Sequence, residues 1–223
     1  MKNTPPPRLR TRLYLITPPQ IADVNEFAAI LETALSAGDV ACLQLRLKGA
    51  DGMIDMQATR EVAAAVTEMA QAYGVAVLIN DSPELAVELG ADGVHVGWDD
   101  ASVKETRAIV GPDMIIGATA KNSRHVAMSA GEAGADYVAF GAFYPTSTKE
   151  GTVQADLELL EIWQESMEIP CVAIGGITVE NAGPLVTAGA DFLAVSSGVW
   201  DYADGAPAAV AAFNALLDSL SAD

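Results

Sequence analysis

The phrases ELGADGVHV at 88–96, EAGADYVAF at 132–140 and TAGADFLAV at 187–195 repeat one pattern along the chain. In each phrase, a helical segment gives way to a glycine, a residue common at helix ends, and then to a short apolar run typical of a strand. The phrases recur at intervals of roughly 40 to 55 residues, which suits a helix and a strand better than a whole domain. They therefore indicate repeated strand and helix units within one fold.

The rest of the chain follows the same alternation. Short runs rich in β-branched residues alternate with longer stretches of helical period, which is typical of a parallel α/β fold. We expect strands at 12–17, 42–47, 75–80, 93–96, 115–120, 137–143, 170–176 and 192–199, and helices at 22–37, 53–73, 83–89, 101–110, 123–133, 155–166, 179–188 and 206–219. Eight strands, each followed by a helix, predict a closed (βα)8 TIM barrel. An open doubly wound sheet is the second interpretation, which ITPPQ at 16–20 disfavours because no GxGxxG follows the first strand.

Length and composition agree with one barrel. The chain has 223 residues, and this fold needs roughly 200 to 250. Hydrophobic residues make up 51% and charged residues 19%, which provides enough apolar surface for a large core. We expect a single domain over 1–223, with 1–11 as a flexible N-terminal segment. Cys42 and Cys171 lie in apolar runs, so we expect buried thiols, and the lack of HExxH or CxxC disfavours zinc.

The charge balance narrows the possible partners. Twelve Lys and Arg residues against thirty Asp and Glu give a net charge of −18, which disfavours nucleic acid and anionic membranes as partners. No apolar run is long enough for a signal peptide or a membrane span, so we expect a cytoplasmic location. Barrels of this kind often pair, so a homo-oligomer is also an open expectation. Small anionic molecules would bind only where positive groups gather locally.

The second expected strand supplies such positive groups. In LQLRLK at 43–48, leucine alternates with Gln44, Arg46 and Lys48. Because side chains alternate between the faces of a strand, the leucines would face the outer helices and the polar residues the barrel mouth. An Arg and a Lys pointing inward are costly unless a negative group meets them. An anionic ligand is the partner we expect, and an edge strand with a solvated side is the alternative.

Carboxylates follow the next two expected strands. Asn80 and Asp81 end the third strand, and Asp100 comes after the fourth. Asp81 and Asp100 are a candidate Mg²⁺ site, because Mg²⁺ takes one or two carboxylates with water and phosphate oxygens. Asp81 as the N-cap of the next helix is the other interpretation.

Two later regions have the chemistry of phosphate-binding loops. Thr146, Thr148 and Lys149 offer hydroxyls and a cation after the sixth strand. Gly176 follows the seventh strand, and Ser196 and Ser197 end the eighth, where this fold commonly binds phosphate. Plain surface turns are the alternative for both regions.

The two histidines do not form a catalytic constellation. His95 lies among valines in an expected strand, so a hydrogen-bonded core histidine is favoured over a general base, and His125 is expected to face solvent. Cations, hydroxyls and carboxylates without a strong base suit the departure of a diphosphate better than proton abstraction.

Six segments together resemble the thiamine phosphate synthase family. LQLRLK at 43–48 is similar to its QxRxK strand, LINDSPELA at 78–86 to its ND motif, and GADGVHVGWDD at 90–100 to its GADGVHxGQxD segment. GAFYPTSTK at 141–149 is similar to its GPxxPTxTK loop, and VAIGGIT at 172–178 and AVSSGV at 194–199 to its thiazole phosphate turns. The resemblance extends from Arg12 to about Val199.

The resemblance implies a transferase that joins hydroxymethylpyrimidine diphosphate to hydroxyethylthiazole phosphate and releases pyrophosphate. By position, the pyrimidine diphosphate would be held by Gln44, Arg46, Lys48 and Asn80, with Thr119 and Lys149 on the diphosphate. The thiazole phosphate would be held by Thr146, Thr148, Gly176 and Ser197, and Ser196 is a further candidate substrate-binding residue. Asp81 and Asp100 would bind Mg²⁺, and Arg46, Lys48 and Lys149 would neutralise the charge that develops on the leaving pyrophosphate.

The chain also departs from the family pattern. Trp98 stands where Gln is common, Ala142 for Pro, Thr119 for Ser, Lys121 for a frequent His, and Pro18 for Asp. Three other interpretations stay open: a thiazole tautomerase of similar design, another phosphate-handling barrel such as an aldolase or epimerase, and a degenerate barrel that binds thiamine precursors without turnover. The tautomerase would have no use for the five charged residues Arg46, Lys48, Asp81, Asp100 and Lys149. An aldolase is disfavoured because no lysine is expected at the barrel centre for a Schiff base.

Overall fold

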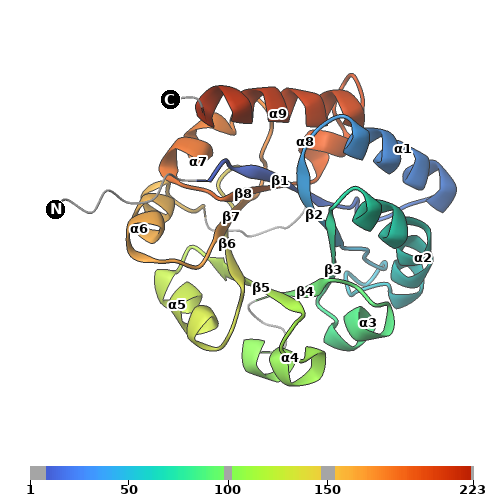
Figure 1. The fold of residues 1–223 in the computed structure, drawn as a ribbon, viewed down its shortest axis with the longest axis horizontal. Helices are drawn as coiled ribbons and strands as arrows, with labels where there is room; N and C mark the ends of the chain where they lie inside the picture. Colours follow the sequence, from blue (N-terminus) through green and yellow to red (C-terminus); the bar gives the residue numbers. More distant parts are fainter. Residues whose placement is uncertain (1–8, 98–101, 147–153, 222–223) are drawn as a thin grey trace.

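The chain folds as a closed barrel of parallel strands inside a ring of helices (Figure 1). The computed structural model describes residues 9–97, 102–146 and 154–221. Within these ranges the eight strands pair in chain order, and β8 pairs back with β1. The strands are β1 Arg12–Ile16, β2 Val40–Leu45, β3 Ala76–Asn80, β4 Gly93–Val96, β5 Ile115–Lys121, β6 Tyr137–Gly141, β7 Cys171–Ile174 and β8 Phe192–Val195. The predicted TIM barrel is confirmed.

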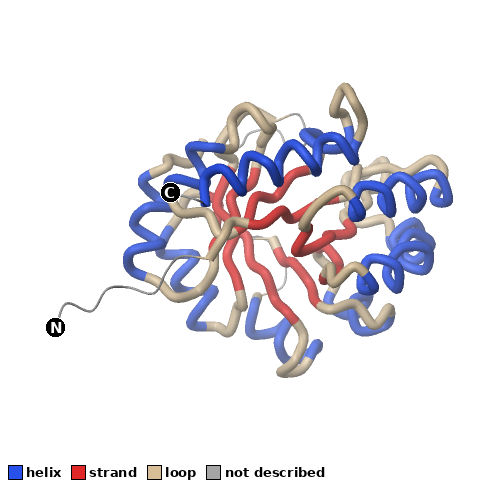
Figure 2. The backbone as a smooth tube through the Cα atoms, turned by 45° about the horizontal axis from the view of Figure 1, so that its top comes forward, coloured by secondary structure: helices blue, strands red, loops and turns tan. Residues whose placement is uncertain are grey.

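The helices lie outside the strands and follow them in alternation (Figure 2). They are α1 Val24–Ser36, α2 Met56–Ala72, α3 Pro83–Glu88, α4 Val103–Val110, α5 Arg124–Glu132, α6 Glu158–Ser166, α7 Gly183–Ala188, α8 Ser197–Trp200 and α9 Ala206–Ser221. Several begin at a side-chain cap, in which an Asp or Ser accepts a hydrogen bond from a backbone N–H of the first turn. Of these helices, none combines the length and the hydropathy that a membrane crossing requires.

The repeated GAD phrases lie at the N-terminal ends of strands, where their aspartates form hydrogen bonds to neighbouring strands. The glycines of these phrases have the positive φ angles that favour glycine, and the aspartates that follow cap the start of an earlier strand. Asp92 accepts a hydrogen bond from the Val77 N–H of β3 at 2.7 Å. Asp136 and Asp191 do the same for β5 and β7, each at 2.8 Å. The sequence repeat is therefore a structural device on the face of the barrel that lies away from the candidate site.

Several predicted strands end earlier than expected, and the ends of β2 and β8 affect the site. The second strand stops at Leu45, so Arg46 and Lys48 lie in the segment after it. The strand predicted at 192–199 stops at Val195, and Ser197–Trp200 forms the short helix α8. The indole N–H of Trp200 donates to the Ile16 carbonyl oxygen at 2.6 Å, and its ring packs 5.2 Å from that of Phe27. This contact joins the end of α8 to the end of β1.

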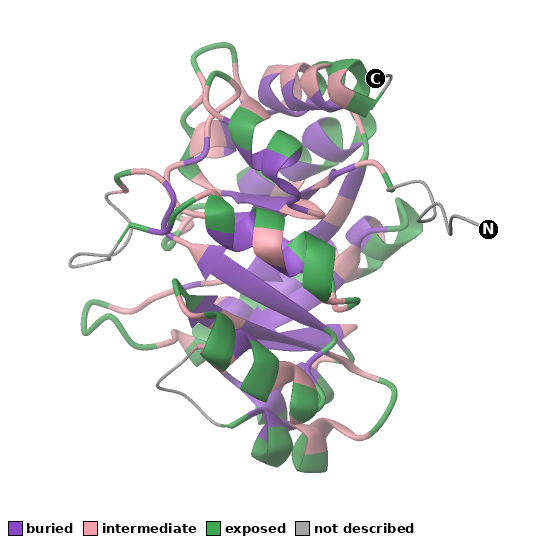
Figure 3. Cartoon of the chain, turned by 90° about the vertical axis from the view of Figure 1, so that its left-hand side faces the viewer, coloured by how far each residue is buried: buried purple, intermediate pink, exposed green. Residues whose placement is uncertain are grey.

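Figure 3 shows that the strands are largely buried, whereas the outer helices carry exposed residues. The buried apolar residues form two clusters. The larger lies between the strands and the helices, and the smaller fills the inside of the barrel. The smaller cluster consists of Tyr14, Ile16, Cys42, Leu78, Tyr137, Ala139, Val172 and Ala194. Cys42 and Cys171 are both buried free thiols, as predicted.

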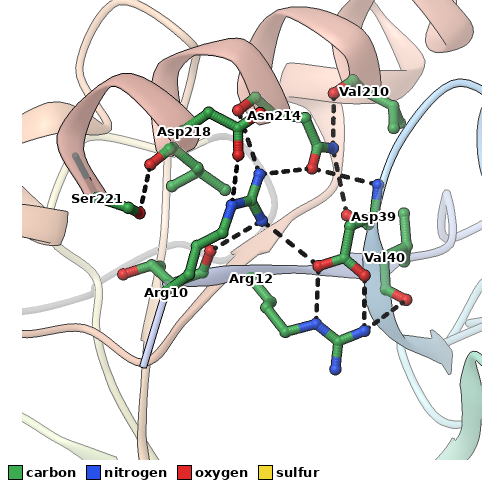
Figure 4. A network of polar contacts seen from close by, with 10 residues as sticks. Arg10, Arg12, Asp39, Val40, Val210, Asn214, Asp218 and Ser221 are labelled. Carbon is green, nitrogen blue, oxygen red and sulfur yellow. Dashed lines mark hydrogen bonds and ion pairs between the residues drawn. The ribbon is translucent and has the colours of Figure 1, made fainter. Parts of the chain in front are cut away.

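A polar network joins β1, the start of β2 and α9 at the N-terminal face of the barrel (Figure 4). Asp39 accepts hydrogen bonds from the Arg12 guanidinium at 2.7 and 2.8 Å. Arg10 pairs with Asp218 at 2.7 Å and donates to the Asn214 side chain at 2.9 Å. Arg10 belongs to the segment 1–11 that was expected to be flexible, yet it is held by these contacts, and residues 1–8 lie outside the described part of the chain.

Candidate active site

Polar side chains from neighbouring strands gather inside the barrel near its C-terminal rim. Gln44 on β2 is 2% exposed, and Asn80, the last residue of β3, is 5% exposed. Asn80 is the register partner of His95 on β4, and Thr119 lies one strand further along on β5. This fold places its active sites at the same rim. The four residues therefore form a polar layer above the apolar interior of the barrel.

The two cations predicted on the second strand lie just beyond its end. The Arg46 N–H donates to the Thr17 hydroxyl at 2.9 Å, and the Lys48 N–H donates to the Pro19 carbonyl at 2.9 Å. Leu47 between them is buried, so the predicted alternation continues past the strand. Thr17, which sequence reasoning did not single out, therefore links the end of β1 to the arginine of the site.

Lys48 and Asp81 form an ion pair across this rim. The ammonium nitrogen lies 2.9 Å from a carboxylate oxygen of Asp81, and the side chains are 18% and 21% exposed. The pair joins the segments that follow β2 and β3, so parallel strand ends bring the two predicted groups together.

Asp81 is not the N-cap of the next helix, so that interpretation was wrong. Ser82 fills this position, and its hydroxyl accepts from the Leu85 N–H. Asp81 instead has a φ of 61°, a left-handed conformation that is uncommon for a residue with a side chain, and its N–H donates to the His95 carbonyl at 2.8 Å. Strained backbone of this kind is often found at functional sites.

Arg46 is the second cation at this rim among the described residues. Its side chain is half-buried, and no carboxylate within residues 9–97, 102–146 and 154–221 forms an ion pair with it. Burial lowers the pKa of the guanidinium, and the nearby charge of Asp81 acts in the opposite direction. A half-buried positive charge of this kind favours binding of an anion.

His95 is a hydrogen-bonded core histidine, as predicted. Its ring nitrogens lie 2.8 Å from the Tyr137 hydroxyl and 2.9 Å from the Thr119 hydroxyl. Burial lowers the pKa of the imidazole from 6.5 to about 4, so the ring is neutral at physiological pH.

The loops after β6 and β7 are fastened to each other. The Tyr144 N–H donates to the Gly175 carbonyl at 3.1 Å, and the Tyr144 hydroxyl donates to the Asn181 carbonyl at 2.7 Å. The Asn181 amide donates to the Gly176 carbonyl at 2.9 Å and accepts from the Thr178 N–H at 2.8 Å. Gly176 has a φ of 63°, and a Cβ there would lie 2.3 Å from the Pro145 carbonyl oxygen. Asn181, three residues after Thr178, was missed at the sequence level.

The comparisons with known proteins identify one family for this chain. Residues 13–199 match the family described as thiamine monophosphate synthase. A thiamine-phosphate synthase from Hyphomonas neptunium is 74% identical over 221 residues, which cover 99% of this chain and 100% of the relative. The chain belongs to the thiamine monophosphate synthase family.

Other relatives of this synthase family agree. A thiamine-phosphate synthase from Rhodospirillum centenum is 56% identical over 92% of this chain and 97% of its own length. The solved structure of thiamine phosphate pyrophosphorylase from Pyrococcus furiosus superposes with a TM-score of 0.80 at 29% identity, covering 94% of this chain and 96% of that one. These names favour the synthase over the tautomerase, the aldolase and the epimerase.

Part of the predicted site lies outside the described residues. Trp98, Asp100, Thr148 and Lys149 belong to this part. Among the described residues, no three His, Cys, Asp or Glu side chains gather as a metal site would require. The other predicted phosphate-loop residues are described: Thr146 and Gly176 are half-buried, Ser196 donates to the Thr17 carbonyl at 3.3 Å, and Ser197 begins α8.

Proposed function

We propose that the chain is a transferase that forms thiamine phosphate from hydroxymethylpyrimidine diphosphate and hydroxyethylthiazole phosphate. The bond between the pyrimidinylmethyl carbon and the diphosphate oxygen breaks, and its electron pair leaves with pyrophosphate. The thiazole nitrogen then supplies the pair for the new C–N bond. The observation that carries this proposal is the pairing of Lys48 with Asp81 beside the half-buried Arg46, at one rim of a chain whose net charge is −18.

Each part of the rim has a proposed role. Gln44 and Asn80 hold the pyrimidine, because their amides face the barrel interior and offer both donors and acceptors. Arg46, Lys48, Thr119 and Lys149 bind the diphosphate, and the three cations neutralise the negative charge that develops on it. The thiazole phosphate is held by Thr146, Thr148, Gly176, Ser196 and Ser197.

A magnesium ion fits part of this arrangement. Asp81 presents a partly exposed carboxylate next to the cations that would bind a diphosphate. Mg²⁺ takes one or two carboxylates together with water and phosphate oxygens, so Asp81 with Asp100 would hold it against the diphosphate. When bound, the ion would stabilise charge on the leaving pyrophosphate.

The direct test is synthesis of thiamine phosphate by the purified protein. The protein is incubated with both substrates and Mg²⁺, and the product is oxidised and followed by thiochrome fluorescence. We expect product with Mg²⁺ and a loss of product with EDTA that added Mg²⁺ reverses. Binding of both substrates without product would support the degenerate barrel, and failure to bind the pyrimidine diphosphate would support the tautomerase.

Several finer expectations stay predictions. They are one functional domain over 1–223, a cytoplasmic location, self-association, and the effect of the departures at Trp98, Lys121, Ala142 and Pro18. Thr119 keeps the hydroxyl of the usual serine, so this departure is compatible with the proposed role.

A further inference from the structure

A chain of hydrogen bonds crosses the inside of the barrel and ends at the candidate site. The Tyr14 hydroxyl on β1 lies 2.9 Å from the Tyr137 hydroxyl on β6. The Tyr137 hydroxyl lies 2.8 Å from Nδ1 of His95, and Nε2 of His95 lies 2.9 Å from the Thr119 hydroxyl. Tyr14, His95 and Tyr137 are buried, whereas Thr119 is half-buried and faces the rim. The chain thus has a closed end in the core and an open end at the site.

The barrel is built to accommodate this chain. A Cβ at Gly117, on β5, would lie 1.9 Å from the Tyr137 ring, so only glycine leaves room for the tyrosine. The His95 and Tyr137 rings stack with centroids 5.6 Å apart, and Tyr14 meets Tyr137 edge to face at 6.0 Å. Aliphatic side chains usually fill this part of a TIM barrel, and buried polar groups are costly unless they are paired. Here polar groups replace aliphatic ones, and their chain of hydrogen bonds reaches the candidate site. This suggests a role beyond filling the core.

A neutral imidazole allows two arrangements of the protons along the chain. One ring nitrogen carries the proton and donates, and the other accepts. If Nδ1 carried it, Nε2 would accept the only hydroxyl proton of Thr119, and that hydroxyl would offer a ligand lone pairs alone. If Nε2 carries it, Nε2 donates to Thr119, and the Thr119 proton points toward the ligand. In that case Tyr137 donates to Nδ1 and Tyr14 donates to Tyr137, whereas the first case reverses both directions. Every hydrogen bond has a donor in either arrangement, and the need of an anionic ligand for a donor selects the second.

We propose that His95 is a positioning residue that holds the Thr119 hydroxyl as a hydrogen-bond donor toward an anionic oxygen of the diphosphate. In this arrangement Tyr137 donates to Nδ1 and Nε2 carries the proton on which the orientation of Thr119 depends. The proposal rests on the proposed function, because an anionic ligand requires a donor and Arg46 and Lys48 lie at the same rim. Oriented donors stabilise developing charge more effectively than donors that must first reorient.

The tautomer can be measured without any turnover. In a His125→Gln background, which removes the exposed second histidine, His95 alone reports in protein labelled with ¹⁵N-histidine. We expect the imidazole nitrogen shifts of the Nε2–H tautomer at neutral pH, both in the unliganded protein and with inorganic pyrophosphate and Mg²⁺. A pure Nδ1–H tautomer with pyrophosphate bound would overturn the proposal. The same measurement on Tyr137→Phe should show a mixture of the two tautomers, and an unchanged Nε2–H state would contradict the role of Tyr137.

Two substitutions then distinguish a positioning role of His95 from a purely structural one. His95→Gln keeps an amide N–H near the place of Nε2, and His95→Leu removes the donor. We expect kcat to fall roughly 10- to 100-fold in His95→Leu, with substantial recovery in His95→Gln and little change in KM for the thiazole phosphate. Circular dichroism and thermal unfolding identify any variant that fails to fold. Equal kcat in the two folded variants would overturn the proposal, whereas a wild type that forms no product would count against the proposed function and leave the tautomer result standing.

Discussion

The ammonium nitrogen of Lys48 lies 2.9 Å from a carboxylate oxygen of Asp81, so the candidate metal ligand and a candidate diphosphate ligand hold each other at the rim of the barrel. The two residues follow neighbouring strands, β2 and β3. The pair keeps two charges satisfied in a partly buried place.

Replacing Lys48 tests the importance of this cation. We expect Lys48→Met to lower kcat/KM by roughly 100-fold, because one of the charges that neutralise the leaving pyrophosphate is lost. Initial rates of thiamine phosphate formation measure the effect. Arg60→Gln is the matched control, since it breaks a 2.7 Å ion pair with Glu88 on the outer helices. Similar rates for Lys48→Met and Arg60→Gln would show that Lys48 does not act on the reaction.

Gly117 is expected to be indispensable to the core because of Tyr137. A Cβ at this position would lie within 2.1 Å of the Tyr137 hydroxyl as well as 1.9 Å from its ring. Both residues are buried in the barrel, so the clash has no easy relief, and we expect Gly117→Ala to cost about 1–3 kcal/mol or more. Urea unfolding measures the change.

The control for this prediction is Gly183→Ala. Gly183 lies in the first turn of α7, and a Cβ there meets nothing within 4 Å. Alanine is also the better helix former, by about 1 kcal/mol in a helix interior. We therefore expect unchanged or raised stability, and a loss as large as that of Gly117→Ala would argue against the clash with Tyr137 as the cause.

The order of the strands and helices was predictable because the signal for it is local. The alternation of apolar runs gave the barrel, and parallel strand ends gave the rim where Lys48 and Asp81 meet. The end of β8 was not predictable in the same way. The Trp200 indole donates to the Ile16 carbonyl, a contact between residues far apart in the sequence. Ser196, Ser197 and Gly198 interrupt the apolar run, but these residues alone do not show that a short helix begins there.

In the candidate site, too, locally encoded features were predictable and long-range contacts were not. Motif resemblance identified residue types at strand ends, and His95 was interpreted as a hydrogen-bonded core residue. Its partners could not be named, because two of them come from β5 and β6, and contacts between strands depend on the register of the barrel. A signal for Tyr137 did exist: a tyrosine at an inward position of a strand opposite Gly117. Asn181 is a similar case, since its role depends on the folded turn around Gly176.

Asn181 is expected to organise the turn proposed to bind the thiazole phosphate. Its side chain bonds to the Gly176 carbonyl and the Thr178 N–H, at 2.9 and 2.8 Å. We expect Asn181→Ala to raise KM for the thiazole phosphate roughly tenfold, the equivalent of about 1.4 kcal/mol, and to leave KM for the pyrimidine diphosphate nearly unchanged. Asn181→Asp keeps the acceptor for Thr178 but not the donor to Gly176, so an intermediate KM is expected. An equal rise of KM for both substrates would indicate general damage instead.

The ion pair of Asp39 and Arg12 predicts a dependence of stability on pH. The hydrogen bond from Arg12 lowers the pKa of Asp39 below its ordinary value of 3.8. As pH falls, the unfolded chain binds a proton at this residue before the folded chain does, so the stabilisation is present above about pH 4 and is lost through the lower folded pKa. Both side chains are about 40% exposed to solvent, so the effect is expected to be modest.

Asp39→Asn measures this contribution. We expect the variant to unfold at lower urea concentration than the wild type at about pH 7, and the difference between the two to shrink as pH falls below about 4 toward the lowered pKa of the folded carboxylate. Glu68→Gln is the control, because it removes the same charge from an exposed position of α2 and should show no comparable change with pH. A difference for Asp39→Asn that is as large at about pH 3 as at about pH 7 would mean that the charge of Asp39 does not stabilise this face of the barrel.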